Sequence, residues 1–279
     1  MKILSTTGWE NYQLLDSGNT RRLERFGKYV LNRPDPQAIW QQKLGPSVWG
    51  NADAVFLRDW KVKNNMPNSW VLKYKDLSLH AHLSPFKHTG IFPEQSINWE
   101  FIEQKVKSSN EKVNLLNLFG YTGISSLVAA KAGATVTHLD ASRPAMNWFR
   151  QNQEASKLMD KPIRLIVDDA LKFTEREIKR GNKYNAVIMD PPVYGHSPEG
   201  AVWDFNKDFP KLMENVSKIL SPNSIFVIVN AYAISASAIM IENVMRDFLD
   251  IFGGIIESGE LCLEKPNPPN ISDTLLLLI

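Results

Sequence analysis

The sequence predicts an α/β protein built on a doubly wound, mostly parallel β-sheet, preceded by a small β-rich domain. From residue 113 onward, short apolar runs alternate with longer amphipathic stretches, which is the pattern of repeated β–α units. The first 88 residues instead contain short alternating runs separated by Gly, Pro and Asn. We therefore assign residues 1–88 to the β-rich domain and residues 89–279 to the α/β domain.

Five apolar runs in the α/β domain have the length of buried parallel strands, and each ends at a polar or glycine-containing turn. Two further strands are expected near Ile255–Leu263 and Thr274–Ile279, which makes a seven-stranded sheet. A Pro-rich loop without room for a crossover helix separates these two, so we expect an antiparallel C-terminal strand. The five parallel strands are expected at Val113–Leu118, Thr135–Leu139, Ile163–Val167, Ala186–Met189 and Ser224–Val229.

Glycine, serine and proline mark the ends of the predicted helices. Gly133 and Gly181 each follow an amphipathic stretch as a helix C-terminus requires, whereas Ser142 with Pro144 is typical of a capped helix start. Helices are expected over residues 97–106, 124–132, 145–158, 170–180 and 235–252, and from Asp208 or a neighbour through Leu220. Strands of the first domain are expected at Tyr12–Leu15, Tyr29–Asn32, Ala54–Leu57, Trp70–Tyr74 and Leu77–His82.

Composition excludes several classes of protein. With 32 Lys and Arg against 30 Asp and Glu, the net charge of +2 provides no global field for a polyanion, so any nucleic-acid contact must be local. Cys262 is the single cysteine, which excludes a disulfide framework and a cysteine-rich metal site. The sequence has neither a signal-peptide pattern nor an apolar run of about 18 residues. We expect a soluble cytoplasmic protein that makes no membrane contact.

The turn after the first parallel strand contains Gly120 and Gly123. Glycines let a ligand approach the backbone closely, and the N-terminus of the following helix offers free N–H groups to a carboxylate or phosphate. A tight turn with no ligand is the alternative interpretation. The dinucleotide fingerprint needs a third glycine, so its absence disfavours NAD, FAD and a nucleotide-dependent oxidoreductase.

Acidic residues follow the next two strands. Asp140 lies 20 residues after Gly120 at a strand end, where a carboxylate can accept hydrogen bonds from both ribose hydroxyls of a nucleoside. Helix capping is the alternative, but Ser142 already provides a cap. After the third strand, one of Asp168 and Asp169 can accept the adenine amino group while the other caps a helix.

The fourth strand ends at Asp190-Pro191-Pro192. Neither proline donates a hydrogen bond, so the loop is rigid and its carbonyls can only accept, which suits a substrate amino group or a sulfonium. A structural Pro-Pro turn is the alternative. All four loops lie at the carboxyl edge of one sheet, near the point where strand order should reverse, and a nucleoside cofactor is their simplest common ligand.

At these residues the sequence resembles the Rossmann-like class I S-adenosylmethionine-dependent methyltransferases, and more narrowly the bacterial large-subunit (23S) ribosomal RNA methyltransferases, in short members without a PUA domain. The motifs that carry the resemblance lie at 86–95, 117–123 and 190–195. The resemblance implies that Phe119, Gly120 and Gly123 surround the methionine moiety, Asp140 holds the ribose and Asp169 the adenine. Gln95 and Phe92 would help to close the site, which also includes Asn117, Ala141, Ser142, Ala170 and Asp190.

Two departures from this family affect the chemistry. Members that methylate carbon-5 of cytosine use a cysteine nucleophile after the fifth strand, but residues 230–237 contain none, and Cys262 is expected to be a buried hydrophobe. Many relatives carry Lys-Phe where this chain has Val193-Tyr194. Tyr194 could stack on a base, or it could serve in core packing or lie on the surface. Asp190, Pro192 and Tyr194 are the residues expected at the transfer step.

RNA, most of all ribosomal RNA, is the substrate that the resemblance favours. The first domain interleaves Trp9, Trp40, Trp49, Trp60 and Trp70 with basic residues at 21, 22, 25, 28 and 33, a mixture suited to RNA but also to a core with a solvated face. A small-molecule or protein methyltransferase, or a non-catalytic RNA-binding module, are the alternatives. The five histidines lack metal-ligand spacing, so no metal is expected. The sequence leaves the oligomeric state open.

Overall fold

The computed structural model describes residues 2–63, 65–196, 202–232, 234 and 237–266. The chain divides into two compact units. One comprises Ile3–Ile97 together with the chain from Glu260 onward, and the other is essentially Asn98–Gly259. The expected boundary at residue 88 thus falls within the first of these units. The division does not show what either unit does.

The N-terminal unit is built mainly from antiparallel strands. Its five-stranded sheet has the order β2-β3-β4-β5-β6, in which only the β4–β5 pair is parallel. A hairpin of β7 and β8 and a short helix, α1 (Pro46–Gly50), complete this part. The strands are β2 (Tyr12–Gly18), β3 (Arg21–Phe26), β4 (Tyr29–Pro34), β5 (Ala54–Phe56), β6 (Trp60–Val62), β7 (Ser69–Tyr74) and β8 (Leu77–His82).

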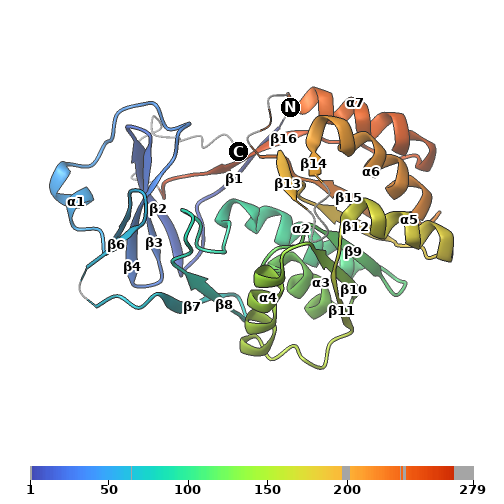
Figure 1. Cartoon of the computed structure of the whole chain (residues 1–279), viewed down its shortest axis with the longest axis horizontal. Helices are drawn as coiled ribbons and strands as arrows, with labels where there is room; N and C mark the ends of the chain where they lie inside the picture. Colours follow the sequence, from blue (N-terminus) through green and yellow to red (C-terminus); the bar gives the residue numbers. More distant parts are fainter. Residues whose placement is uncertain (1, 64, 197–201, 233, 235–236, 267–279) are drawn as a thin grey trace. The chain divides into compact units, whose positions relative to one another are not determined.

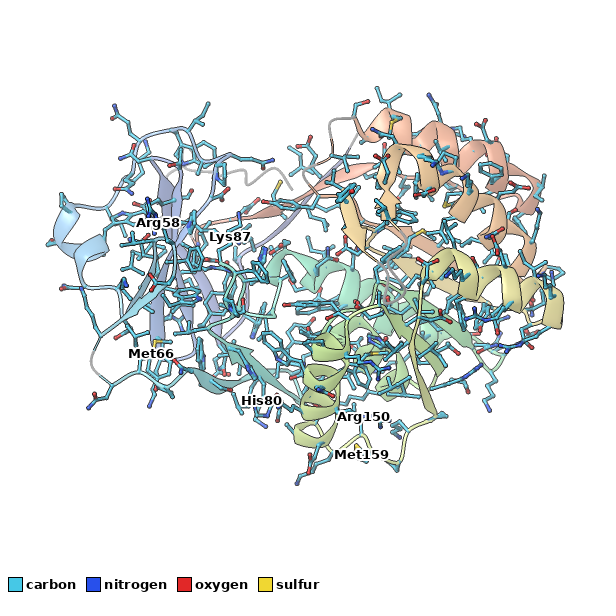
Figure 2. All side chains as sticks on the ribbon, in the orientation of Figure 1. Arg58, Met66, His80, Lys87, Arg150 and Met159 are labelled. Carbon is cyan, nitrogen blue, oxygen red and sulfur yellow. The ribbon has the colours of Figure 1, made fainter. Side chains whose placement is uncertain are left out.

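A buried group of charges lies at the centre of this sheet. Glu24 on β3 receives hydrogen bonds from Arg33 Nε at 2.7 Å and Nη2 at 2.8 Å, and from the Tyr12 hydroxyl at 2.9 Å. Burial would raise the pKa of Glu24, but Arg22 and Arg33 outweigh burial and the pKa is lowered. Arg33 Nη1 also donates to the carbonyl of Lys87, which is labelled in Figure 2, at 3.1 Å.

The second unit contains a five-stranded, fully parallel sheet in the order β11-β10-β9-β12-β15. The chain runs outward from β9 through β10 to β11, then returns to the other side of β9 with β12 and β15. The strand order therefore reverses between β9 and β12. These strands are β9 (Asn114–Leu118), β10 (Thr135–Asp140), β11 (Ile163–Val167), β12 (Ala186–Met189) and β15 (Phe226–Val229).

Helices cover both faces of this sheet, with α3 and α4 on one side and α5, α6 and α7 on the other (Figure 1). Ser142 caps α4, Asp169 caps α5 and Asp204 caps α6, each accepting a main-chain N–H of the first turn. Left-handed Gly133 and Gly181 end α3 and α5, as predicted. The helices are α2 (Ser96–Ser108), α3 (Ile124–Ala132), α4 (Arg143–Ala155), α5 (Ala170–Arg180), α6 (Phe205–Ile219) and α7 (Ala238–Leu249), followed by a 3-10 turn, η2 (Asp250–Phe252).

The C-terminal part differs from the prediction. The strand expected near Ile255–Leu263 is β16 (Gly259–Leu263), but it pairs with β1 (Lys2–Thr6) in a separate two-stranded sheet and does not join the five parallel strands. The N-terminal segment, which the sequence did not predict to be a strand, provides that partner. The last predicted strand, Thr274–Ile279, lies outside the described residues, so the seven-stranded sheet and its antiparallel strand remain predictions. No helix among the described residues combines the length and apolar character needed to cross a bilayer.

The buried charges of the N-terminal unit predict a large effect of substitution. We expect Glu24→Gln to lower the free energy of unfolding by about 3–5 kcal/mol, because two buried guanidinium groups lose their counter-charge. The matched control is Glu214→Gln, which removes a carboxylate from an exposed pair with Lys218 and should cost about 0.2–1 kcal/mol. Urea unfolding of both variants measures the difference, and equal losses would contradict a stabilising role of the buried pairs.

Candidate functional site

The candidate site lies at the carboxyl edge of the parallel sheet, where strand order reverses. The loop after β9 begins at Phe119 and the loop after β12 begins at Asp190, so the two loops flank the reversal point on neighbouring strands. β10 ends at Asp140, beside β9 on the other side. In open parallel sheets this is where ligands bind, because adjacent loops diverge there. The expected convergence of these loops on one edge is confirmed.

The loop 119–123 has an unusual main chain. Phe119 and Tyr121 have φ values of 56° and 50°, and Gly123 has a φ of 81°. Left-handed conformations are costly for residues with a Cβ and tend to occur at functional sites. The surrounding structure must therefore hold this loop in place.

The glycines of this loop are required by packing within the protein. A Cβ at Gly120 would lie 2.3 Å from Cε1 of His138, and one at Gly123 would lie 1.8 Å from Cδ2 of Phe149. The glycines are therefore needed for close packing of the loop on β10 and α4. That the same glycines also let a ligand approach the main chain stays a prediction.

Asp140 is the most constrained acid of the site. Its Oδ2 accepts the N–H of Tyr121 and its Oδ1 accepts the N–H of Ser142, both at 2.8 Å. Burial raises the pKa of this carboxyl, and the two main-chain N–H groups partly offset that rise. Each oxygen keeps a further lone-pair direction. The carboxylate can thus bind two hydroxyl groups of a ligand.

The acids after β11 both have partners within the protein. Asp169 Oδ1 accepts the N–H of Lys172 at 3.0 Å as the cap of α5. Asp168 forms an ion pair with Arg176 and accepts the N–H of Asp169 at 2.8 Å. The capping alternative is therefore confirmed for Asp169. Its adenine contact stays a prediction, as do those of the neighbouring small residues Ala141 and Ala170.

The loop after β12 is fixed by a residue that the sequence did not single out. Trp203 is 5% exposed, and its indole N–H donates to the carbonyl of Pro192 at 2.6 Å. Its ring also packs edge-on against Phe119 at a centroid distance of 5.1 Å. Trp203 therefore contacts both loops that flank the reversal point. A tryptophan just before a helix N-terminus carries no sequence signal for this role, since only the folded hairpin brings it there.

Trp203 belongs to a small antiparallel hairpin of β13 (Tyr194–His196) and β14 (Val202–Asp204). Tyr194 pairs with Asp204 in this hairpin and is 58% exposed, so core packing is excluded for its ring. Asp190 is exposed at the head of the loop. The exposed acid therefore begins the segment after β12, and the exposed aromatic ring follows at the start of β13.

The remaining predicted cofactor residues occupy different positions. Asn117 is buried in β9, and its amide donates to Ser126 Oγ on α3 at 2.9 Å, so its side chain is used in packing. Phe92 and Gln95 belong to the N-terminal unit, where Gln95 ends the 3-10 turn η1 (Pro93–Gln95). Their role in closing the site stays a prediction.

The tryptophans and arginines of the N-terminal unit have internal partners. Each of the five indole N–H groups donates to an acceptor of the same unit, and Arg21, Arg25 and Arg33 also donate to acceptors there, while Arg22 pairs with Glu24. This favours the structural interpretation of the aromatic and basic mixture. The indole acceptors are Lys73 O, Ser17 O, Asp16 Oδ2, Ser84 O and Phe26 O, for Trp9, Trp40, Trp49, Trp60 and Trp70 in turn.

Two other expectations concern metals and the cysteine. Among the described residues, no group of three or more His, Cys, Asp or Glu side chains could hold a metal ion. Cys262 is buried, as expected for a small hydrophobe. Burial, with Glu260 and Glu264 adding to it, raises the pKa of this thiol, which disfavours the nucleophilic thiolate.

Comparison with known proteins identifies the family of this site. Residues 57–271 match the S-adenosylmethionine-dependent methyltransferase family. The crystal structure of an S-adenosylmethionine-dependent methyltransferase from Agrobacterium tumefaciens superposes with a TM-score of 0.96 at 37% sequence identity, covering 100% of this chain and 91% of that one.

Two curated relatives are ribosomal RNA large subunit methyltransferases K/L. The one from Pseudoalteromonas atlantica is 32% identical over 143 residues, which is 50% of this chain and 19% of that protein. The one from Shewanella frigidimarina is 30% identical over 151 residues, 53% of this chain and 20% of that protein. The similarity thus spans about a fifth of the length of these relatives.

The packing of the loop on α4 predicts the effect of one added methyl group. We expect Gly123→Ala to destabilise the protein by about 2–4 kcal/mol, since the new Cβ meets Phe149 and the residue must keep a left-handed conformation. Gly181→Ala is the control, because Gly181 has a φ of +70° but open space around the site of its Cβ. It should cost only about 1–2 kcal/mol. Thermal or urea unfolding compares the two, and a Gly123→Ala loss no larger than that of the control would refute the packing argument.

Proposed function

Because the chain belongs to the S-adenosylmethionine-dependent methyltransferase family, we propose that it transfers the methyl group to a nucleophilic atom of RNA, and of ribosomal RNA in particular. The names of the two curated relatives support this substrate class. The observation that carries the methyl-transfer part of the proposal is the pair of loops, headed by Phe119 and Asp190, at the reversal point of a parallel sheet beside Asp140.

The residues at the sheet edge fit this cofactor. Asp140 is held by two main-chain N–H groups, yet it retains lone pairs for the two ribose hydroxyls. Gly123 precedes α3 without a side-chain cap, so the first turn of that helix offers main-chain N–H groups to the methionine carboxylate. In this assignment Asp169 and Ala170 line the adenine side, with Ala141 and Ser142 following the ribose ligand.

The cofactor supplies an electrophilic methyl group on a positively charged sulfur. For an in-line displacement of this kind, the protein has mainly to align donor and acceptor and to exclude water. In this proposal Asp190 orients a nucleophile that carries a hydrogen and stabilises positive charge that develops on it. The Pro192 carbonyl accepts the Trp203 N–H, which holds the loop in shape, and its second lone pair leaves it able to share this task.

No covalent cysteine intermediate enters this proposal. The only cysteine of the sequence, Cys262, is buried and its pKa is raised, so it is a poor nucleophile. A carbon that needs prior activation by a thiolate is therefore disfavoured as acceptor. A nitrogen or oxygen nucleophile, which can attack directly, agrees better with an acid at the head of the acceptor loop.

The assignment of Asp140 predicts a loss of cofactor affinity. We expect Asp140→Ala to weaken binding of S-adenosylhomocysteine at least about tenfold, because two hydrogen bonds to a charged acceptor disappear. Asp160→Ala, in the exposed turn after α4, is the control and should leave the affinity unchanged. Isothermal titration measures both, with circular dichroism to confirm folding. Unchanged affinity in folded Asp140→Ala would exclude the ribose role.

The substrate class is tested by following a labelled methyl group. Purified protein is incubated with tritiated S-adenosylmethionine and one of three fractions from cells that lack the gene. The fractions are protein-free 23S ribosomal RNA, total protein and small metabolites. We expect label in the RNA, and loss of that label with Asp190→Ala. Label confined to protein or to metabolites would replace RNA by that class of substrate. A lack of label in every fraction, despite cofactor binding, would instead support a non-catalytic module.

A further inference from the structure

His138 is a buried histidine for which the proposed function gives no role. It is 0% exposed in β10, two residues before Asp140. Its Nδ1 lies 2.9 Å from Ser126 Oγ, which itself accepts the side-chain N–H of Asn117 at 2.9 Å. Three buried polar side chains from β9, α3 and β10 are thus joined beneath the loop 119–123.

This histidine is neutral. Burial lowers the pKa of His138 to about 3 and outweighs a main-chain interaction with Tyr121 that acts in the opposite direction. In the neutral ring, Nδ1 and Ser126 Oγ share one hydrogen bond, whose direction follows from the imidazole tautomer. The ring can therefore pack as an aromatic group, and it contacts Phe149 at a centroid distance of 4.4 Å.

The ring lies directly against the loop. The space that a Cβ of Gly120 would need is taken by the imidazole, with Cε1 2.3 Å away. On the same strand, the carbonyl of Leu139 accepts the Gly120 N–H at 2.9 Å and the carboxylate of Asp140 accepts the Tyr121 N–H. Consecutive residues of β10 therefore hold consecutive residues of the loop.

We propose that His138 is a positioning residue for the cofactor, acting through the loop 119–123. Its ring, fixed by Ser126, supports the loop from below and holds Phe119 and Tyr121 in their left-handed conformations. Those conformations set the direction of the Tyr121 N–H, and with it the orientation of the Asp140 carboxylate. This inference rests on the proposed role of Asp140 in cofactor binding.

The experiment separates positioning from general stability. His138→Phe keeps an aromatic ring but removes the hydrogen bond to Ser126, and Ser126→Ala removes the same bond from the other side. Ile219→Ala is the control for lost core packing, because Ile219 is 0% exposed. It ends α6, and its carbonyl accepts the N–H of Tyr184, just before β12. S-adenosylhomocysteine is titrated into each variant by calorimetry, and the thermal midpoint is recorded in its absence.

We expect His138→Phe to weaken binding of S-adenosylhomocysteine about tenfold and Ser126→Ala about threefold. The affinity of Ile219→Ala should stay within twofold of that of the unmodified protein, even though its thermal midpoint falls as far as that of His138→Phe. The double variant should bind no more weakly than His138→Phe, since both substitutions remove one interaction. If His138→Phe does not fold, the test is the affinity of Ser126→Ala compared with that of Ile219→Ala.

Two results would overturn the inference, and they are distinguishable. If the unmodified protein binds S-adenosylhomocysteine and the variants at 138 and 126 bind as well as Ile219→Ala, His138 has no positioning role while the cofactor assignment stands. If the unmodified protein itself does not bind, the proposed cofactor role of Asp140 fails, and the role of His138 fails with it.

Discussion

The candidate site depends on the contact between the loop 119–123 and strand β10. A loop with two left-handed non-glycine residues is unstable by itself, and here the strand holds it through the Leu139 carbonyl, the His138 ring and the Asp140 carboxylate. The same contact orients the acid that we assign to the cofactor. A change that loosens the loop 119–123 is therefore expected to shift the Asp140 carboxylate as well, because the same contacts hold both.

The two units use buried polar groups in opposite ways. In the N-terminal unit, Glu24 stays charged in the core because two arginines lower its pKa. In the α/β unit, His138 has no counter-charge and stays neutral because burial lowers its pKa to about 3. The ion pair between Glu24 and Arg33 links β3 to β4 in the core of the N-terminal unit.

The sequence predicted the α/β unit well because local signals and tertiary packing agree there. β11, α3 and α5 have the bounds that apolar runs, caps and glycines indicated. Strand β3 was missed because its charged residues look solvent-exposed, and burial of Glu24 depends on Arg33 of β4 and Tyr12 of β2 as well as on Arg22 of the same strand. For a related reason Trp203 could not be identified, since its partners Pro192 and Phe119 are distant in sequence. The partner of β16 lies at the opposite end of the chain, beyond any local pattern.

The interleaved tryptophans and arginines of the first domain show why composition is weak evidence for RNA binding. An indole N–H and a guanidinium are costly to bury without acceptors, and here each of those we described has one inside its own unit. The internal hydrogen bonds explain these residues without any RNA contact. The case for RNA therefore rests on the curated relatives, and an RNA contact in this chain must come from exposed groups such as Tyr194 near the acceptor loop.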